Sequence, residues 1–526
     1  MIKTHQLILL IFCFGVFKFS KAQLDVQKLQ AQDFIKYEDY TRGLEAYLKL
    51  YSTNKQDVEI NYYTGLCYTN VNGDKALALP FLEFVKKANP KFHPELNLHI
   101  GRAYMYAYKF DDALSYLNTF RKECNPKEYK RVDRLIASCE DAKVLIKNPV
   151  NVTFQNLGKE INTKFPDYYP FVVEDEGIMY FTSRRNANTG NLLTWQGYYS
   201  SDIYYSKVKN GEWTKAKNIG PNINTAEDEQ CVHVSNDGRT MVVYKDDATN
   251  KISGDLFLTQ MGKTKTFPKP VAFDPPANLE KFNELEGYLF VDENTIIISS
   301  DREGTMGEMD LFMIKKLPSG KWAVPVNLGP NINTVFNEAF PVYDEQNHIL
   351  YFSSEGHINM GGFDIFKSEF DVKNGVFGPA TNIGYPINTP EDNMEFTLMP
   401  NRRDGYTSAV RKEGYGDLDV YRVTFNAVSP RPTILNGYIF TGDSLKKDID
   451  AEISITDFVT KKEIDSKKVN KKTGRYVFAV DPGKKYTLKV VSPGYIEVKE
   501  DITIYDKSDY TFEKEKNITL IKSGGG

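Results

Sequence analysis

The sequence is poor in the residues that most often carry catalytic or metal chemistry. It holds six histidines, five cysteines and three tryptophans in 526 residues. It contains no His-Glu-x-x-His pair, no Gly-x-Ser-x-Gly elbow and no glycine-rich phosphate loop. His233 stands in an alternating strand pattern and His357 in a loop, and neither has a catalytic neighbour in sequence. We therefore expect no enzyme activity, no cofactor and no metal site.

Cysteine is too scarce to form a disulfide framework. Four cysteines remain beyond the first 22 residues, and none forms a Cys-x-x-Cys pair. Three of them fall in helical patterns, where cysteine commonly serves as a small buried apolar residue. A Cys124–Cys139 bridge is the alternative in an oxidising compartment. The four are Cys67, Cys124, Cys139 and Cys231.

Only the N-terminus carries a long apolar run. Lys3 precedes the apolar stretch 7–19, and Ser20-Lys21-Ala22 follows it, which is typical of a cleaved secretory signal. A membrane anchor is the alternative, but this run is short against the ~20 residues that a spanning helix needs. Cleavage of residues 1–22 removes three lysines and no acid, so the formal charge changes from −4 to −7. A mildly acidic chain disfavours binding to nucleic acid.

Residues 23–148 have the pattern of paired helices. Apolar residues recur three and four positions apart, and proline is scarce. Two similar stretches contain Gly65 and Gly101 and end at Asn89-Pro90 and Asn125-Pro126. This segment resembles tetratricopeptide repeats, in which a small residue lets the two helices of a pair approach. The resemblance implies a concave groove for a partner. A purely structural cap on the next domain is the alternative.

Between residues 149 and 428 a motif returns at a nearly fixed interval. An Asp followed by an aliphatic and an aromatic residue recurs at steps of 53, 55, 54 and 55 residues. Asn-Leu/Ile-Gly and Ile-Asn-Thr run in phase with it. Hairpin signals divide each period into four short strands, which indicates a β-propeller with one blade per period. The motif starts at Asp202, Asp255, Asp310, Asp364 and Asp419.

We expect five blades, and a sixth would need sequence that we do not find. The run 150–154 precedes the first Asn-Leu-Gly at the place of an outer strand, so it could complete the last blade and leave no free edge. The strand pair that carries the Asp motif resembles the TolB-like, WD-repeat-like propellers of exported bacterial proteins. That resemblance says little about chemistry, because propellers host many functions.

Two sets of acids in this region differ in what they predict. The recurrent Asp of the motif should be structural and accept hydrogen bonds from loop amides between blades. A second set stands at matching places four residues after the Thr, where each could project toward the axial channel. A carboxylate ring could hold a cation, a basic side chain or a sugar; capped, solvated loops are the alternative. This set is Asp167, Glu229, Glu284, Glu338 and Asn393.

The pattern of residues 429–522 predicts a small β-sandwich. The linker signal Ser429-Pro430-Arg431-Pro432 is followed by short alternating runs and by turns at Pro482-Gly483 and Pro493-Gly494. This arrangement resembles the carboxypeptidase regulatory-like domain, a module that spaces or docks. Residues 523–526 have the composition of a flexible linker or end segment.

The order of signal, helical repeats, propeller and sandwich resembles the PorE-like periplasmic proteins of type IX secretion and gliding. Members usually continue into an OmpA-like peptidoglycan-binding domain, which this sequence does not contain. The resemblance implies a scaffold at the inner face of the outer membrane, bound to a PorP-like β-barrel partner. We expect a non-catalytic adaptor. A secreted propeller hydrolase or a glycan-binding protein that uses the acidic ring is the competing hypothesis.

Overall fold

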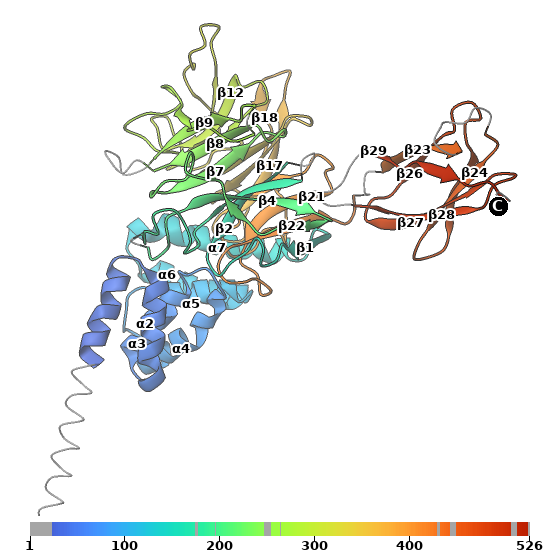
Figure 1. Cartoon of the computed structure of the whole chain (residues 1–526). Coiled ribbons are helices and arrows are strands. Elements are labelled where there is room, and N and C mark those ends of the chain that lie inside the picture. Colours follow the sequence, from blue (N-terminus) through green and yellow to red (C-terminus); the bar gives the residue numbers. More distant parts are fainter. Residues whose placement is uncertain are drawn as a thin grey trace, which may run out of the picture.

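The computed structural model describes residues 24–173, 177–194, 196–246, 254–263, 265–428, 432–441, 449–505 and 513–523. The expected signal peptide 1–22, residues 429–431 of the linker signal and the terminal Gly524–Gly526 lie outside these ranges. Figure 1 shows helices on one side of a larger β-rich region, with a separate strand module projecting from it. Among the described residues, no helix combines the length and apolarity needed to cross a membrane.

The N-terminal region is helical throughout. Residues 24–36 form a helix, and Asp39 and Asp57 cap the next two by accepting from Arg42 N and Ile60 N. The helices are α2 (Tyr40–Thr53), α3 (Val58–Tyr68), α4 (Leu79–Ala88), α5 (Leu96–Tyr106), α6 (Phe110–Glu123) and α7 (Tyr129–Leu145), with short 3₁₀ turns η1 (Lys75–Ala78) and η2 (Pro126–Glu128).

Close contact within helix pairs explains the two motif glycines. A Cβ on Gly65 would lie 2.5 Å from Leu82 Cγ, and one on Gly101 would lie 2.7 Å from Leu117 Cγ. Leu82 belongs to α4 and Leu117 to α6, so each glycine lets α3 or α5 approach its partner helix. This confirms the role expected of both glycines. All four cysteines are free, and Cys67 and Cys139 are buried in the helical cores.

Each sequence period between Val152 and Phe425 forms one antiparallel sheet. The first four sheets contain β2 (Asp167–Val173), β3 (Ile178–Ser183), β4 (Asp202–Lys209), β5 (Glu212–Trp213) and β6 (Lys217–Asn218); β7 (Glu229–Val234), β8 (Thr240–Lys245), β9 (Asp255–Gln260) and β10 (Val271–Ala272); β11 (Glu284–Leu289), β12 (Thr295–Ser300), β13 (Asp310–Lys315) and β14 (Val326–Asn327); and β15 (Glu338–Asp344), β16 (Ile349–Ser354), β17 (Asp364–Asp371), β18 (Val376–Phe377) and β19 (Thr381–Asn382).

The fifth sheet joins the two ends of the β-rich region. It contains β20 (Phe396–Leu398), β21 (Asp404–Ala409), β22 (Asp419–Phe425) and, as its outer strand, β1 (Val152–Asn156). β1 runs antiparallel to β22, with Val152 opposite Phe425 and Asn156 opposite Tyr421. The first strands of successive sheets contact one another in a closed order, and β2 contacts β21. The pairing confirms that the first strand completes the last sheet, which makes this region propeller-like.

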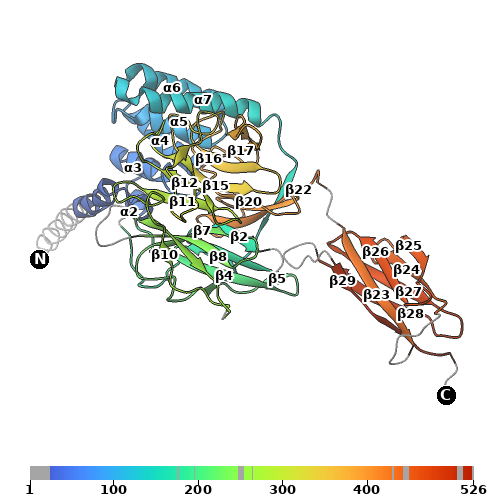
Figure 2. The same cartoon turned by 90° about the horizontal axis from the view of Figure 1, so that it is seen from above.

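The C-terminal module has two sheets around one core. One contains β23 (Thr433–Thr441), β26 (Arg475–Val480), β29 (Glu513–Glu515) and β30 (Ile518–Leu520). The other contains β24 (Glu452–Asp457), β25 (Glu463–Lys468), β27 (Lys484–Val491) and β28 (Val498–Ile504). Both sheets contribute to a single buried cluster that includes Leu435, Tyr476 and Leu488. Figure 2 shows this module beside the rest of the chain. Tyr505 lies against Gly211 at the turn between β4 and β5.

Candidate functional site

The predicted acidic ring consists of buried structural groups. Asp167, Glu229, Glu284 and Glu338 begin the first strands of their sheets and have no exposed side-chain surface, and Asn393 is almost as buried. Each therefore lies inside the protein at the start of a strand. The structure does not arrange them as free carboxylates around an open channel, which corrects the expectation that they could hold a ligand.

These side chains accept hydrogen bonds from loop amides and hydroxyls of the same sheet, and some also form ion pairs with its cations. Thr163, Thr225, Thr334 and Thr389 each donate a backbone N–H and a hydroxyl to the acid or amide four residues later. Three of the acids also form an ion pair with a cation in the second strand of their own sheet or just after it. These ion pairs are Asp167–Arg185 at 2.6 Å, Glu229–Lys245 at 2.6 Å and Glu284–Arg302 at 2.8 Å. Glu338 has Ser354 instead, and burial raises its pKa to about 7.

The recurrent motif Asp braces its own sheet rather than the gap between blades. Asp202, Asp310, Asp364 and Asp419 accept from a backbone amide in the loop before their strand, at Thr189, Met306, Met360 and Tyr415 respectively. Each also accepts from the Asn of an Asn-x-Gly motif on the outer strand: Asn218, Asn327, Asn382 and Asn156. Asp255 holds the matching place at the start of β9.

The Asn of the Ile-Asn-Thr motif makes the hydrogen bonds that join neighbouring sheets. Asn333 accepts from Leu311 N at 2.9 Å and donates to Leu311 O at 3.0 Å, like a paired strand residue. Asn162 makes the same pair of bonds with Val420, across the junction where the chain ends of the region meet. The corresponding pairs elsewhere are Asn224–Ile203, Asn278–Leu256 and Asn388–Ile365. The repeated motifs therefore maintain the architecture.

A different set of side chains lines a pocket at the centre of the β-rich region, two residues beyond the predicted ring. Its volume is about 230 Å³, and its lining includes Tyr169, Glu286, Phe340 and Glu395. We call it the central pocket. Three of these residues lie where the strand register shifts, between Tyr168 and Phe171, Glu284 and Gly287, and Ala339 and Val342. A bulge of this kind re-aims a side chain out of the regular ladder.

The two central glutamates lack the partners that the outer acids have. Glu286 and Glu395 are 8% and 5% exposed, and Oε2 of each has no hydrogen-bond partner. The Tyr169 hydroxyl donates to Glu286 Oε1 at 3.4 Å. Burial, offset by the nearby Ser299 hydroxyl and reinforced by the charge of Glu395, raises the pKa of Glu286 to about 8. Burial raises the pKa of Glu395 to about 7.

Sequence reasoning missed this pair although a signal existed. Glu286 interrupts the apolar first strand β11 in Leu285-Glu286-Gly287, and Glu395 stands between Met394 and Phe396, directly before β20. They have the same phase in their periods, two positions after Glu284 and Asn393. A charge at the third position of such a strand is unexpected in a buried sheet. The predicted ring stands two residues before this pair, at the position that follows the Thr motif.

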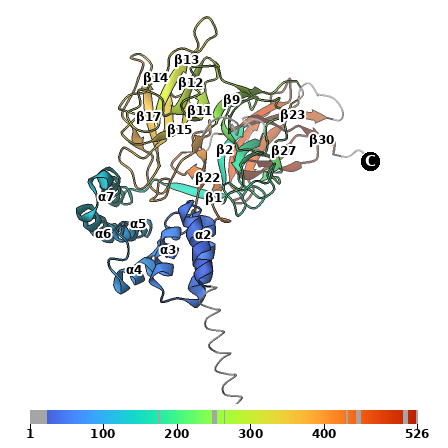
Figure 3. The same cartoon turned by 90° about the vertical axis from the view of Figure 1, so that its left-hand side faces the viewer.

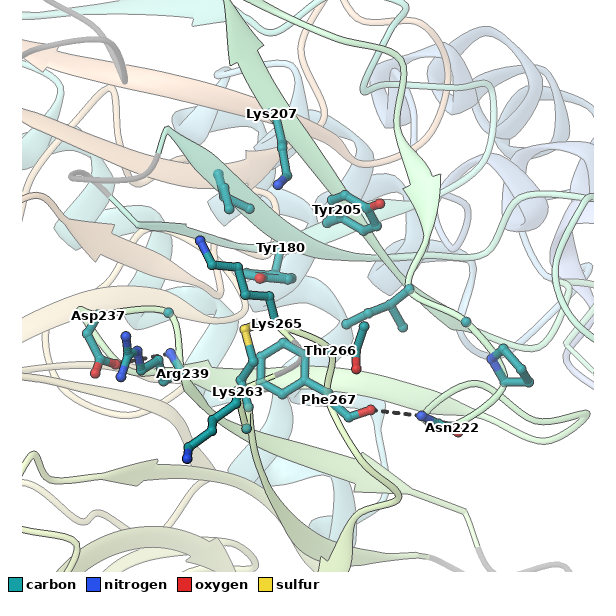
Figure 4. Close-up of a pocket in the computed structure, with 17 residues that line it drawn as sticks. Tyr180, Tyr205, Lys207, Asn222, Asp237, Arg239, Lys263, Lys265, Thr266 and Phe267 are labelled. Carbon is teal, nitrogen blue, oxygen red and sulfur yellow. Dashed lines mark hydrogen bonds between the residues drawn. The ribbon is translucent and has the colours of Figure 1, made fainter.

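A second pocket is an open groove between the outer edges of neighbouring sheets. Its volume is about 810 Å³, and Figure 4 shows Lys207, Arg239, Lys263 and Lys265 around it. The dashed line marks the hydrogen bond from Asn222 to the Phe267 carbonyl, at 3.0 Å. A similar groove lies between the third and fourth sheets, where Asn331 donates to the Phe377 carbonyl. These grooves therefore belong to the repeat, and all four cations are exposed.

The helical region is fastened to the β-rich region by polar groups. The ion pair Lys75–Glu391 spans 2.5 Å, and the lysine is 7% exposed. From α7, Arg134 donates to the Gly356 carbonyl and Ser138 to Asn359. The loop between β16 and β17 also places Met360 in the core of the helices. Figure 3 shows the helices along one side of the strands. Part of the helical surface expected to bind a partner thus serves the chain itself.

Among the described residues, no three His, Cys, Asp or Glu side chains are grouped so as to hold a metal ion. His233 is buried in β7, and burial lowers its pKa to about 3. His357 Nε2 bonds to the Ile332 carbonyl. Neither histidine lines the central pocket.

Comparison with known proteins gives only distant likenesses. No protein-family model matches the sequence, and no curated protein matches it. One similar solved structure is the alpha-L-arabinofuranosidase from Lactobacillus brevis, with 12% identity, a TM-score of 0.33, and coverage of 53% of this chain and 93% of that one. A second is a protein of unknown function from Dyadobacter fermentans DSM 18053, with 13% identity, a TM-score of 0.32, and coverage of 66% and 98%.

A third solved structure is described as MamA MSR-1 C2. It is 22% identical, with a TM-score of 0.21, and the match covers 23% of this chain and 67% of that one. All three TM-scores are too low to support an argument about activity.

Proposed function

We propose that this chain is a non-catalytic periplasmic scaffold that holds other proteins at the inner face of the outer membrane. In this proposal the β-rich region is a five-bladed propeller and the C-terminal module a regulatory-like sandwich. The signal peptide 1–22 exports the chain, and a PorP-like outer-membrane β-barrel of the type IX secretion or gliding apparatus is a partner. The resemblance in domain order supports these partners.

The observation that carries the proposal is the polar junction between the helices and the strands. Lys75 is nearly buried at this junction and reaches Glu391 from a different module. Charged pairs of this kind fix one relative orientation, because breaking them leaves a buried charge unpaired. The helices and the propeller then present a fixed surface to partners, while the C-terminal module extends away from it (Figure 1).

Site-specific photocrosslinking in the native envelope tests the proposal. A photoreactive residue replaces Leu77 in η1, Val324 between β13 and β14, or Val459 after β24, which are 47%, 81% and 81% exposed. We expect at least one position to capture an outer-membrane protein, identified by mass spectrometry. Buried Leu350 provides the matched control and should capture none. The absence of crosslinked outer-membrane proteins from all three exposed positions would contradict the scaffold.

The central pocket favours a second candidate, a secreted glycan-binding protein or hydrolase. Two carboxyl groups, Glu286 and Glu395, line one pocket together with Tyr169, and pairs of carboxyl groups perform glycoside hydrolysis in many enzymes. The test is incubation of the chain with a panel of plant and bacterial oligosaccharides. Turnover that is lost in both Glu286→Gln and Glu395→Gln would establish the hydrolase and remove the claim that the scaffold is non-catalytic.

A further inference from the structure

We propose that the central pocket binds an organic cation with a primary ammonium group, held between the carboxylates of Glu286 and Glu395. The site does not include the Lys75–Glu391 pair on which the scaffold proposal rests, although Asn72 of the helical region lines its mouth. A lysine side chain of a partner and a small free amine share this chemistry. The inference stands or falls independently of the scaffold.

The first argument is the contrast with other buried acids in the same region. Asp167, Glu229 and Glu284 each have a cation of their own chain within 2.8 Å. Glu286 and Glu395 have none, and one oxygen of each lacks any hydrogen-bond donor. Asp202, Asp364 and Asp419 also have one oxygen without a partner, but none of these three lines the central pocket. A buried carboxylate is costly unless it is paired. Both oxygens therefore have the capacity for a donor from outside the chain.

The cation among the residues that line this pocket is already engaged. Arg184 lines the pocket, but its guanidinium pairs with Asp228 at 3.1 Å and donates to the Tyr199 carbonyl at 3.1 Å. Its pKa is raised through the charges of Tyr168 and Asp228 although burial opposes this. Arg184 thus stays charged and committed to other partners. A positive charge for the two glutamates has to come from a ligand.

The lining favours an ammonium group over a metal ion. A calcium ion takes six to eight oxygen ligands, whereas this pocket offers two carboxyl groups, and the described residues contain no larger acidic group of metal-binding type. The aromatic rings of Tyr168, Tyr169 and Phe340 line the same space. Aromatic faces attract organic cations, and a carboxylate supplies the opposite charge. The volume of about 230 Å³ has room for a small amine or the end of a side chain.

The chain itself contains a lysine bound in this manner. Lys75 of the helical region pairs with Glu391 of the β-rich region at 2.5 Å, and its ammonium lies 4.8 Å from the centre of the Tyr106 ring. A carboxylate and an aromatic ring therefore hold a nearly buried lysine from a different module. The central pocket has the same kinds of group, a second carboxylate and no resident lysine.

The mouth of the pocket lies close to the helices. Asn72, which follows α3, lines it together with Tyr198. Asn72 donates to Asp417 at 2.7 Å, and the Tyr198 hydroxyl donates to the same carboxylate at 3.1 Å. These hydrogen bonds tie the helical region to the rim. A ligand in the pocket would contact Asn72 of the helical region as well as the strands. Its binding would therefore depend on how the two regions are oriented relative to each other.

Isothermal titration of the full chain with n-butylammonium chloride tests the inference. We expect saturable binding that weakens at least tenfold in Glu286→Gln and in Glu395→Gln. Gln keeps the size of each side chain, and using the two variants separately keeps the test valid if one misfolds. Glu369→Gln, at an exposed position of β17, is the matched control and should bind like the unmodified chain. Affinity should also rise from pH 6 to pH 8.5, because the acids then carry more negative charge.

Further probes define the ligand. A blocked peptide with one central lysine, compared with the same peptide acetylated on its lysine, distinguishes a partner side chain from a free amine: tighter binding than n-butylammonium indicates the partner. Binding of n-butanol as tight as that of n-butylammonium would overturn the inference. So would calcium chloride or methyl β-xylopyranoside binding in a Glu286-dependent way while the amine does not bind. Amine affinity in both Gln variants equal to that of the unmodified chain would overturn it too.

Discussion

Two sets of acids in the β-rich region stand two residues apart in sequence and have opposite surroundings. Glu284 accepts from a loop amide, a serine hydroxyl and Arg302. Glu286, on the same strand, has a tyrosine hydroxyl on one oxygen and no partner on the other. The first set is therefore fixed by the architecture, whereas the second keeps hydrogen-bonding capacity for a ligand. Burial alone does not separate these two sets, but the number of occupied acceptors does.

The largest loss of stability should come from removing the cation that pairs with a buried acid of the first set. Arg302→Met leaves Glu284 buried without its positive partner, which should lower the free energy of unfolding by about 3–5 kcal/mol. Urea unfolding followed by tryptophan fluorescence measures this, because Trp213 and Trp322 lie in the β-rich region. Arg239→Met, at an exposed position, is the control and should change stability by less than about 0.5 kcal/mol. Equal stability of the two variants would contradict the comparison.

The second-largest loss of stability should come from Glu391, whose cation belongs to the helical region. Lys75→Met should cost about 2–3 kcal/mol, because Glu391 loses its partner at the junction. A double-mutant cycle with Glu391→Gln isolates the pair, and we expect a coupling free energy of about 1–3 kcal/mol. Protease sensitivity of the segment between α7 and β1 should rise in the single variant. A coupling near zero would mean that the pair does not hold the modules together.

A smaller effect of opposite sign should follow substitution of an unsatisfied acid. The pKa of Glu286 is raised to about 8 in the folded chain, so its contribution to stability is full below its ordinary pKa of about 4.5 and is lost as the pH rises through 8. The titratable groups that share its pocket are Glu395, Arg184, Tyr168, Tyr169 and Tyr198. Glu286→Gln should therefore gain about 1–2 kcal/mol at pH 8.5 relative to the unmodified chain, and nothing at pH 4.5. Unfolding curves at both pH values measure this difference.

The smallest change in stability is expected at Asn393, the one member of the first set that is an amide. Asn393→Asp converts the one neutral member to an acid, which could accept from Thr389 as Glu338 accepts from Thr334. At pH 5 the cost should stay below about 1 kcal/mol, because a buried carboxyl without a cation remains protonated. The cost should grow toward pH 8. A large loss already at pH 5 would show that Asn393 acts through its amide N–H₂ rather than as an acceptor.

Much of the fold was predictable because it is repeated. The interval of the Asp motif predicted one sheet per period, and the run before Asn156 predicted the strand that completes the last sheet. Repetition reveals an architecture even without a relative, since each copy reports the same backbone requirement. The glycine contacts of α3 and α5 followed from the same logic. The acid sites did not, because a carboxylate and its partners come from segments with no fixed spacing.

The sequence by itself determined the periodic elements: local patterns of apolar residues, Asn and Gly specify strands, turns and helix contacts within a few tens of residues. Only the tertiary structure decided which acids are neutralised. A bulge shifts Glu286 out of the strand ladder, and the cyclic order of the sheets brings it into one pocket with Glu395, more than a hundred residues away in sequence. Electrostatic partnership depends on distances across the fold, and no sequence interval encodes those distances.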